Sequence, residues 1–487
     1  MFVGIDLGTT SVKTILVDEA GTTLGSATEP VPVSRPRPGW SEQDPEHWWS
    51  AVLATLDALK ARHPAELAAV WGIGLSGHMH GATLLDAQDR VLSPAILWND
   101  GRSADECLDI EAGTPEARRI TGNICMPGFT APKLAWVRRH EPDVFRQVAK
   151  VLLPKDFVRL RLIGDYVSDM SDAAGTYWLD VAERDWSDAL LAATGLDRSH
   201  MPRLAEGTEA TGRLLPDLAA RWGMAANPVV AGGAGDNAAS ACGIGAVTPG
   251  TAFLSLGTSG VLFVSNARFS PNTEGAVHAF CHALPQTWHQ MGVILSATDS
   301  LNWLSRIVGE PAPALAGALG PRVSAPADVM FLPYLSGERT PWNDAAARGV
   351  FVGLSQSTER AALTQAVLEG VGFAFRDCLR VLEEAGTAVT RAVAVGGGAN
   401  SPLWLSIMAS ILDRPLDLGA DADVGAALGA ARLGMAAALG GDPVRFMPPP
   451  ALKATVEPDP ALVPAYAEAY ARYRALYPLA KAAQPRG

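Results

Sequence analysis

The stretch Ile5-Asp6-Leu7-Gly8-Thr9-Thr10-Ser11-Val12-Lys13-Thr14-Ile15-Leu16 decides the fold, because its pattern occurs a second time. The second copy is Leu254-Ser255-Leu256-Gly257-Thr258-Ser259-Gly260-Val261-Leu262-Phe263-Val264-Ser265, about half of the 487-residue chain further on. Each copy has a β-rich run, a Gly-Thr turn and a second β-rich run, which is typical of a β-hairpin. We therefore predict two related domains that each open with a hairpin.

The tip of each hairpin carries groups that bind anions. Glycine lets the backbone turn tightly, so that N–H groups and hydroxyls converge on a phosphate. The two tips, Gly8–Thr10 and Gly257–Ser259, predict that the two halves hold one polyphosphate from opposite sides. The copies differ where Asp6 is matched by Ser255, so we expect Asp6 alone to position a metal ion. Chance recurrence of a common Leu-Gly-Thr turn is the competing explanation.

Length and composition restrict the class of protein. A chain of 487 residues exceeds what one hydrophobic core organises, which predicts two domains, 1–245 and 246–487. The formal net charge of −12 argues against a nucleic-acid or anionic membrane partner. The five cysteines lack a C-x-x-C pair, which argues against a disulfide frame or a structural zinc site. The sequence shows no signal peptide and no membrane span, so we expect a cytoplasmic protein.

Strand-like and helix-like segments mix in both halves, which predicts an α/β fold. We expect strands over 69–76, 228–233 and 391–395, and helices over 237–246, 296–306, 358–384, 401–412 and 424–437. The helices at 237–246 and 424–437 are rich in Gly and Ala, so they can cross closely and form a hinge between the domains. Ordinary tight packing is the alternative, and the two interpretations are compatible. The helical tail after the Pro-rich residues 447–450 is expected to be peripheral.

Two glycine-rich strand ends mark candidate sites. In Gly235-Asp236-Asn237-Ala238-Ala239 an acid opens a small-residue helix, so Asp236 is either an N-cap or a general base in a cleft. In Gly396-Gly397-Gly398-Ala399-Asn400 the glycines leave room for a flat or phosphorylated ligand. A third pattern, Gly72-x-Gly74-x-x-Gly77, leads into a β-rich run and not into a helix, which argues against a dinucleotide site.

These motifs, in this order and over almost the whole chain, resemble the actin/Hsp70/hexokinase superfold and, within it, the FGGY carbohydrate kinases. The resemblance implies two actin-like, ribonuclease H-like ATPase domains with a cleft between them. It implies Mg²⁺ at Asp6. The residues implied to bind ATP are Gly8, Thr9, Thr10, Lys13, Gly257, Thr258, Ser259, Asn302, Gly397, Gly398 and Asn400.

Finer motifs are similar to one branch of the family, the kinases of D-xylulose. They are Ser41-Glu42-Gln43-Asp44-Pro45, Met79-His80-Gly81-Ala82-Thr83, Leu97-Trp98-Asn99-Asp100, Ser171-Asp172-Ala173-Ala174-Gly175-Thr176 and Ser336-Gly337-Glu338-Arg339-Thr340-Pro341. The branch phosphorylates D-xylulose to D-xylulose 5-phosphate with ATP. It implies that Met79, His80, Trp98, Asp236 and Asn237 contact the ketose, with Asp236 as the general base.

Two departures from that branch leave the substrate open. The run Gly232–Gly235 is one residue longer than expected before the acid, and His78 replaces an expected Gln beside Met79 and His80. A kinase of another pentulose or pentitol, such as ribulose or xylitol, is the alternative. A chaperone-like ATPase of the same superfold is a further alternative, and it would need neither a base at Asp236 nor a sugar pocket. A homodimer is compatible with the resemblance, although the sequence does not fix the oligomeric state.

Overall fold

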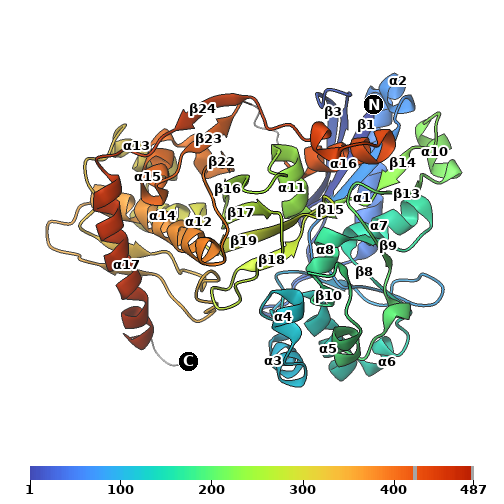
Figure 1. The fold of residues 1–487 in the computed structure, drawn as a ribbon, viewed down its shortest axis with the longest axis horizontal. Coiled ribbons are helices and arrows are strands. Elements are labelled where there is room, and N and C mark those ends of the chain that lie inside the picture. Colours follow the sequence, from blue (N-terminus) through green and yellow to red (C-terminus); the bar gives the residue numbers. More distant parts are fainter. Residues whose placement is uncertain (421–424, 484–487) are drawn as a thin grey trace.

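Two seven-stranded sheets form the centres of two lobes in the computed structural model, which describes residues 1–420 and 425–483 (Figure 1). The first sheet contains, in spatial order, β13 (Ala210–Arg213), β14 (Val229–Ala231), β5 (Gly72–Gly77), β1 (Phe2–Leu7), β2 (Ser11–Val17) and β3 (Thr23–Pro30), with β15 (Ala234–Gly235) also paired to β5. The second contains β18 (His278–Cys281), β19 (Trp288–Ile294), β17 (Gly260–Asn266), β16 (Ala252–Leu256), β22 (Ala392–Val395), β23 (Leu416–Gly419) and β24 (Leu452–Val456). The predicted α/β fold is confirmed.

Both predicted hairpins are present. β1 pairs antiparallel with β2 as far as Leu7↔Val12, and β16 pairs antiparallel with β17 as far as Leu256↔Gly260. Each first strand also has a parallel neighbour, β5 beside β1 and β22 beside β16. The carboxyl ends of these parallel strands therefore lie beside the hairpin turns, where ligands bind in open α/β sheets.

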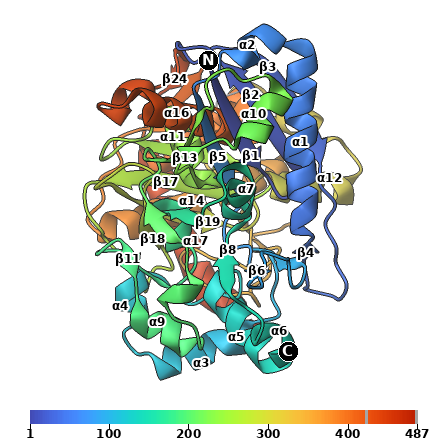
Figure 2. The ribbon, with the colours of Figure 1, turned by 90° about the vertical axis from the view of Figure 1, so that its right-hand side faces the viewer.

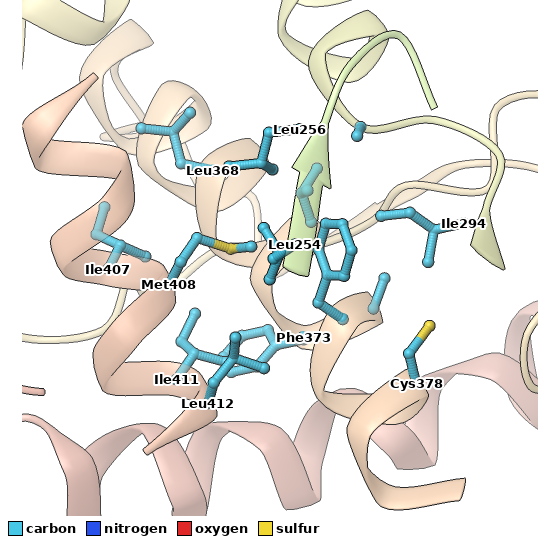
Figure 3. Close-up of a cluster of buried hydrophobic side chains, with 14 of the residues drawn as sticks. Leu254, Leu256, Ile294, Leu368, Phe373, Cys378, Ile407, Met408, Ile411 and Leu412 are labelled. Carbon is cyan, nitrogen blue, oxygen red and sulfur yellow. The ribbon is translucent and has the colours of Figure 1, made fainter. Parts of the chain in front are cut away.

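Helices cover both sheets. In the N-terminal lobe α1 (Pro45–Arg62) runs along the outer strands of the first sheet, as Figure 2 shows, and its side chains Trp48 and Leu56 are buried. In the C-terminal lobe α14 (Arg360–Glu384) and α15 (Pro402–Leu412) pack against the second sheet. Figure 3 shows this core, in which Leu254 and Leu256 of β16 meet residues of α14 and α15 such as Phe373 and Met408.

The other helices are α2 (Pro64–Ala68), α3 (Ala104–Gly113), α4 (Ala117–Thr121), α5 (Thr130–His140), α6 (Pro142–Phe145), α7 (Pro154–Ile163), α8 (Met170–Ala174), α9 (Asp188–Ala193), α10 (Pro216–Trp222), α12 (Thr298–Val308) and α13 (Ala312–Ala318). The short strands outside the two large sheets are β4 (Glu42–Gln43), β6 (Thr83–Leu85), β7 (Ala95–Ile96), β8 (Lys150–Leu152), β9 (Val167–Asp169), β10 (Leu179–Asp180), β11 (Asp185–Trp186), β12 (Arg203–Ala205), β20 (Met330–Leu332) and β21 (Val350–Val352). Among the described residues, no helix has both the length and the apolar character needed to cross a bilayer.

The two small-residue helices cross as closely as their sequences predict. They are α11 (Asp236–Ile244) and α16 (Ala426–Leu439), and the predicted first residue of the second, Val424, lies outside the described residues. A Cβ placed on Gly429 would lie 1.7 Å from the carbonyl oxygen of Ala239, and one on Gly243 would lie 2.4 Å from that of Gly425. Only glycine fits at these positions, because backbone occupies the space of a side chain. The close crossing is confirmed, whereas the hinge stays a prediction.

Helix α16 also completes the N-terminal lobe, although it comes late in the chain. In Figure 1 it lies beside the blue strands of the first sheet. A Cβ on Gly4 would lie 2.0 Å from the carbonyl oxygen of Ala427, and one on Gly74 would lie 1.7 Å from that of Ala430. Glycines in β1 and β5 thus let the helix backbone rest directly on the sheet, and α16 is packed between the sheet and α11.

The C-terminal helix α17 (Val463–Ala483) is part of the core, so the expectation of a peripheral tail was wrong. Its tyrosines 466, 470, 473 and 477 follow the spacing of one helix face, and their hydroxyls form hydrogen bonds with polar side chains of the C-terminal lobe. The hydroxyl of Tyr466 donates to Glu369 Oε1 at 2.9 Å, and that of Tyr477 donates to Asp344 Oδ2 at 2.6 Å. The spacing of these tyrosines in the sequence indicates a helix with one buried face, which composition alone does not reveal.

Candidate active site

Two carboxylates, those of Asp6 and Asp236, lie near the carboxyl ends of two strands in the first sheet and interact through their charges. In the parallel strands β1, β5 and β15, Leu7 is paired with Gly77, and Gly77 with Gly235. Asp6, the last residue but one of β1, therefore lies two strands away from β15, which Asp236 directly follows. Gly235 is the N-cap residue of α11, so Asp236 is the first helical residue and not the cap. Its Oδ1 accepts from the backbone N of Asn237 at 2.7 Å and from Asn237 Nδ2 at 2.9 Å.

The surroundings of Asp236 raise the pKa of its carboxyl group. Removal from water, together with repulsion by the Asp6 carboxylate, raises the pKa of Asp236 to about 6. A carboxylate with such a pKa is mostly ionised at neutral pH yet accepts a proton more readily than an exposed aspartate. Of the two alternatives left open by the sequence, this geometry favours the general base.

Asp6 has the features of a metal-binding carboxylate. Its Oδ1 is buried and has no hydrogen-bond partner among the described residues. Burial raises its pKa, while Ser76 and the charge of Lys13, which faces Asp6 across the hairpin, oppose that rise. No group of three or more His, Cys, Asp or Glu side chains in the described part of the chain could enclose a metal. This donor set fits Mg²⁺, which is commonly bound through one or two carboxylates together with phosphate oxygens and water.

Met79 and His80 form the turn that follows β5. A Cβ on Gly235 would lie 2.8 Å from Met79 Cγ, so Met79 contacts the strand end that leads into Asp236. His80 has a φ of 72°, a left-handed conformation that is uncommon outside glycine and concentrates at functional sites. Its carbonyl oxygen accepts from Lys133 Nζ at 2.8 Å and from Thr130 Oγ1 at 3.2 Å, which holds the turn in this conformation.

His80 presents a hydrogen-bond acceptor. Burial, with smaller effects from nearby cations, lowers its pKa to about 3, so the ring is neutral at physiological pH. Its Nδ1 lies 2.5 Å from the carbonyl oxygen of Gly175, which can only accept, so Nδ1 carries the proton. Nε2 is then the acceptor nitrogen and is suited to a hydroxyl donor. The motifs predicted a role for His80 but none for Lys133, Thr130 or Gly175.

A fully buried charge cluster lies beneath the Asp236 segment. The backbone N of Gly235 donates to Ser171 Oγ at 3.1 Å, and Ser171 Oγ donates to Asp169 Oδ2 at 2.5 Å. Lys155 Nζ lies 2.6 Å from Asp156 Oδ1 and 2.7 Å from Asp169 Oδ1. Removing one member of such a buried cluster is strongly destabilising, so the cluster fixes the position of the loop that carries Asp236.

The long glycine run before Asp236 has a steric cause. A Cβ on Gly232 would lie 2.1 Å from the carbonyl oxygen of Glu206, and one on Gly233 would lie 2.3 Å from that of Leu75. Gly233 also has a φ of 72°, which glycine adopts without penalty. The extra residue is therefore accommodated as closely packed backbone between β14 and β15.

His78 is packed against the N-terminal core. Its ring lies 5.4 Å from that of Trp48, in an edge-to-face arrangement, and its backbone N donates to the carbonyl oxygen of Leu7 at 2.8 Å. Neither ring nitrogen has a protein partner among the described residues, and burial lowers the pKa of His78 to about 3. The second departure from the D-xylulose kinase motifs thus lies where α1 meets the end of β5.

Two side chains hold the turn of the first hairpin, which is predicted to bind phosphate. Gln43 Nε2 donates to the carbonyl oxygen of Thr9 at 2.7 Å, and Trp98 Nε1 donates to Thr9 Oγ1 at 3.0 Å. Thr10 is exposed and Gly8 half-buried. The structure places Trp98 on this turn, and its predicted contact with the sugar stays a prediction.

A cavity of about 650 Å³ adjoins the second hairpin. It is lined by residues of α12, α13 and α15 and by the turn 397–400, and it brings together the predicted residues Asn302, Gly397, Gly398 and Asn400. A Cβ on Gly396 would lie 2.8 Å from the carbonyl oxygen of Leu256, so the cavity borders the turn Gly257–Ser259. Thr298 Oγ1 donates to the carbonyl oxygen of Gly257 at 2.8 Å. Its size and largely apolar lining suit a nucleoside.

Comparisons with known proteins identify the family of the chain. Residues 1–243 match the family model described as the FGGY family of carbohydrate kinases, N-terminal domain, and residues 252–438 match its C-terminal domain. A xylulose kinase of Escherichia coli (strain K12) is 52% identical over 482 residues, which cover 98% of each chain. A solved structure from Brucella ovis, described as a xyloylose kinase, is 58% identical with a TM-score of 0.98 and covers 99% of this chain and 100% of its own. A xylulose kinase structure from Rhodospirillum rubrum is 31% identical with a TM-score of 0.90 and covers 98% of each chain.

Proposed function

The chain belongs to the FGGY family of carbohydrate kinases, and we propose that it phosphorylates D-xylulose with ATP to give D-xylulose 5-phosphate. The observation that carries this proposal is the edge of the first sheet, where Asp236, Asp6 and the Met79–His80 turn come together. The similarity to xylulose kinases over nearly the whole chain supports D-xylulose as the acceptor.

The proposed reaction uses Asp236 as the general base. The terminal hydroxyl of the ketose is a weak nucleophile. Asp236 accepts the proton of this hydroxyl while the hydroxyl oxygen attacks the γ-phosphorus of ATP. The bond from the γ-phosphorus to the bridging oxygen breaks, and ADP leaves with that oxygen. Phosphoryl transfer otherwise depends mainly on positioning and charge stabilisation, for which we assign the turns Gly8–Thr10 and Gly257–Ser259. Met79 and Nε2 of His80 orient the sugar, with Asn237 beside the base.

The metal assignment rests on Asp6. Its buried Oδ1 without a partner is the group that Mg²⁺ would engage, directly or through water. Bound there, Mg²⁺ would neutralise charge on the β- and γ-phosphate oxygens. Lys13, opposite Asp6 in the hairpin, places a further cation on the same side of the first turn.

We assign different ligands to the two lobes. Residues 1–245 would bind the sugar and the metal, and residues 246–487 would bind ATP through Asn302, Gly397, Gly398 and Asn400 at the 650 Å³ cavity. Helix α16 is the exception, because it belongs to the second segment but packs on the first sheet.

A coupled assay of ADP release over a panel of pentuloses and pentitols tests the proposal. We expect D-xylulose to give the highest kcat/KM, ahead of D-ribulose and xylitol. A higher value for either of the others would assign the chain to a different acceptor. ATP hydrolysis that is not stimulated by any sugar in the panel would favour the chaperone-like alternative.

The duplicated hairpin gives a matched pair of variants. Asp6→Asn should raise the Mg²⁺ concentration needed for half-maximal activity by about 10–100-fold and lower turnover, with D-xylulose binding retained, because it weakens a ligand of the metal. Ser255→Ala changes the equivalent position of the second hairpin and should alter turnover by less than about twofold, since we assign no metal to that copy. Mg²⁺ titrations of both variants measure the difference. Equal damage by both changes would contradict the asymmetric assignment.

A further inference from the structure

Arg339 belongs to a rigid segment of the C-terminal lobe. It lies between Glu338 and Thr340, both buried. The backbone N of Thr340 donates to the carbonyl oxygen of Val293 at 3.0 Å, and the backbone N of Val293 donates to Thr340 Oγ1 at 3.0 Å. These bonds attach the segment to the end of β19, so the backbone of Arg339 is fixed where the two lobes meet.

Helix α17 braces the same segment from outside. Asp344 pairs with Glu338 through two backbone hydrogen bonds, of 2.8 and 2.9 Å. The side chain of Asp344 accepts from the hydroxyl of Tyr477, and the ring of Tyr477 stacks on Trp342 at 4.0 Å. The buried face of α17 thus supports the segment that presents Arg339.

The guanidinium of Arg339 lacks an anionic partner within the described residues. No carboxylate oxygen of residues 1–420 and 425–483 forms an ion pair with it at 4.0 Å or less, and its one side-chain hydrogen bond to those residues joins Nη1 to His278 Nε2 at 3.4 Å. The neighbouring Glu338 forms no ion pair with this guanidinium among the described residues: its Oε1 accepts from the backbone N–H groups of Leu295 and Arg339, and its Oε2 has no hydrogen-bond partner there. Removal from water lowers the pKa of Arg339. A half-buried guanidinium whose donors are mostly not used by the described residues can bind a ligand that carries oxygen acceptors.

The contacts of Arg339 lead to the predicted sugar site. Its partner His278 lies 5.9 Å, between ring centroids, from Phe129, and Phe129 lies 5.0 Å from His80. The charge of Arg339 also lowers the pKa of His80 and of His278, as expected for groups that share one region. Met79, the neighbour of His80, contacts Gly235, the residue before Asp236. Arg339 and Asp236 are thus connected to the Met79–His80 turn by different contacts, Arg339 through His278 and Phe129, and Asp236 through Gly235.

We propose that Arg339 binds the C1–C2 end of the ketose, the end remote from the hydroxyl that is phosphorylated at Asp236. This inference rests on the proposed function. The carbonyl at C2 and the hydroxyls beside it offer acceptor oxygens to a planar guanidinium, which can donate two parallel hydrogen bonds. A pentitol lacks that carbonyl and presents a hydroxyl in its place. Arg339 would then be a specificity residue, supplied to the sugar by the lobe that we assign to ATP.

Kinetics of Arg339→Met and Arg339→Lys test the proposal, with Arg348→Met as the control from the same region of the chain. Arg348 is exposed, and its guanidinium donates to backbone carbonyls nearby. We expect Arg339→Met to raise the KM for D-xylulose about tenfold or more, the size of a lost charge-assisted hydrogen bond. The KM for ATP and sugar-independent ATP hydrolysis should change by less than about twofold. Arg339→Lys should raise the KM for D-xylulose less, because lysine keeps the positive charge but cannot donate two parallel hydrogen bonds from one planar group.

A second readout addresses specificity. Inhibition by xylitol, measured against the pentulose, should weaken less in Arg339→Met than binding of the pentulose does. An unchanged KM for the pentulose, an equal weakening for pentulose and xylitol, or the same effect in Arg348→Met would overturn the assignment. If the substrate panel selects another pentulose, the comparison is made with that sugar. Failure of the D-xylulose assignment and failure of the Arg339 assignment are thus seen separately.

Discussion

Asp236→Asn lowers kcat by roughly 10²–10⁴-fold, the usual contribution of a general base, while binding of D-xylulose and ATP stays within about threefold. The substitution keeps the shape of the side chain and removes the group that accepts the proton. Steady-state kinetics with a direct binding measurement for each substrate separates the two effects. Asp217→Asn is the matched control, because Asp217 also lies in the first turn of a helix but is exposed on α10. Near-normal turnover in a folded Asp236→Asn variant would leave the residue a structural role only.

The pH dependence of the wild-type enzyme gives an independent check. Because Asp236 must be ionised to accept a proton and its pKa is about 6, kcat/KM for D-xylulose should fall about tenfold per pH unit below that value. The residual activity of Asp236→Asn should lack this inflection, whereas Asp217→Asn should retain it. A wild-type profile that is flat down to pH 5 would exclude Asp236 as a base with the raised pKa.

The raised pKa of Asp236 also predicts that its ionised form lowers the stability of the folded protein. The pKa of Asp236 in the folded protein is raised from the ordinary value of 3.8 to about 6, so the folded state binds the proton more tightly than the unfolded state does. Its contribution to stability is therefore present below pH 4 and is lost as the pH rises to about 6. At pH 7.5 we expect Asp236→Asn to raise the Tm above that of the wild type. A lower Tm would mean that the hydrogen bonds to Asn237 outweigh the burial of the charge.

Gly429→Ala should destabilise the protein by about 3 kcal/mol or more, above the common range for overpacking. The added methyl would lie 1.7 Å from the carbonyl oxygen of Ala239, and backbone on both helices leaves it no space. Urea unfolding and the soluble yield measure the effect. Gly113→Ala at the exposed end of α3 is the matched control, because no atom lies within 4 Å of its added Cβ.

A companion variant separates the two faces of α16. Ala427 packs with Phe2 and Ile15 on the first sheet, whereas Gly429 meets α11. Ala427→Leu should therefore cost about 1–3 kcal/mol through the sheet contact. If Gly429→Ala were as stable as the wild type, the close crossing of α11 and α16 would be wrong. In that case the contact between α11 and α16 would be revised, and the contact between α16 and the first sheet would stand.

Local pattern was enough to predict much of this protein. The β-rich runs on either side of the Gly-Thr turns predicted both hairpins, and the glycine and alanine content of two helices predicted their close crossing. These features depend on residues near one another in the chain, which is why spacing and residue type reveal them. The family also follows from sequence, because its motifs stand in order over the whole chain.

The tertiary structure decided where distant segments meet. It placed α16 on the first sheet, made α17 a buried helix, and brought Arg339 to the region of His80 and His278. It also set the chemistry of Asp236, whose pKa depends on burial and on Asp6 two strands away. A hydrophobic pattern records which face of an element is buried, but not which element covers it. Charge interactions depend on distance in space, so the sequence determined the parts of the site, and only the folded chain determined their contacts and protonation.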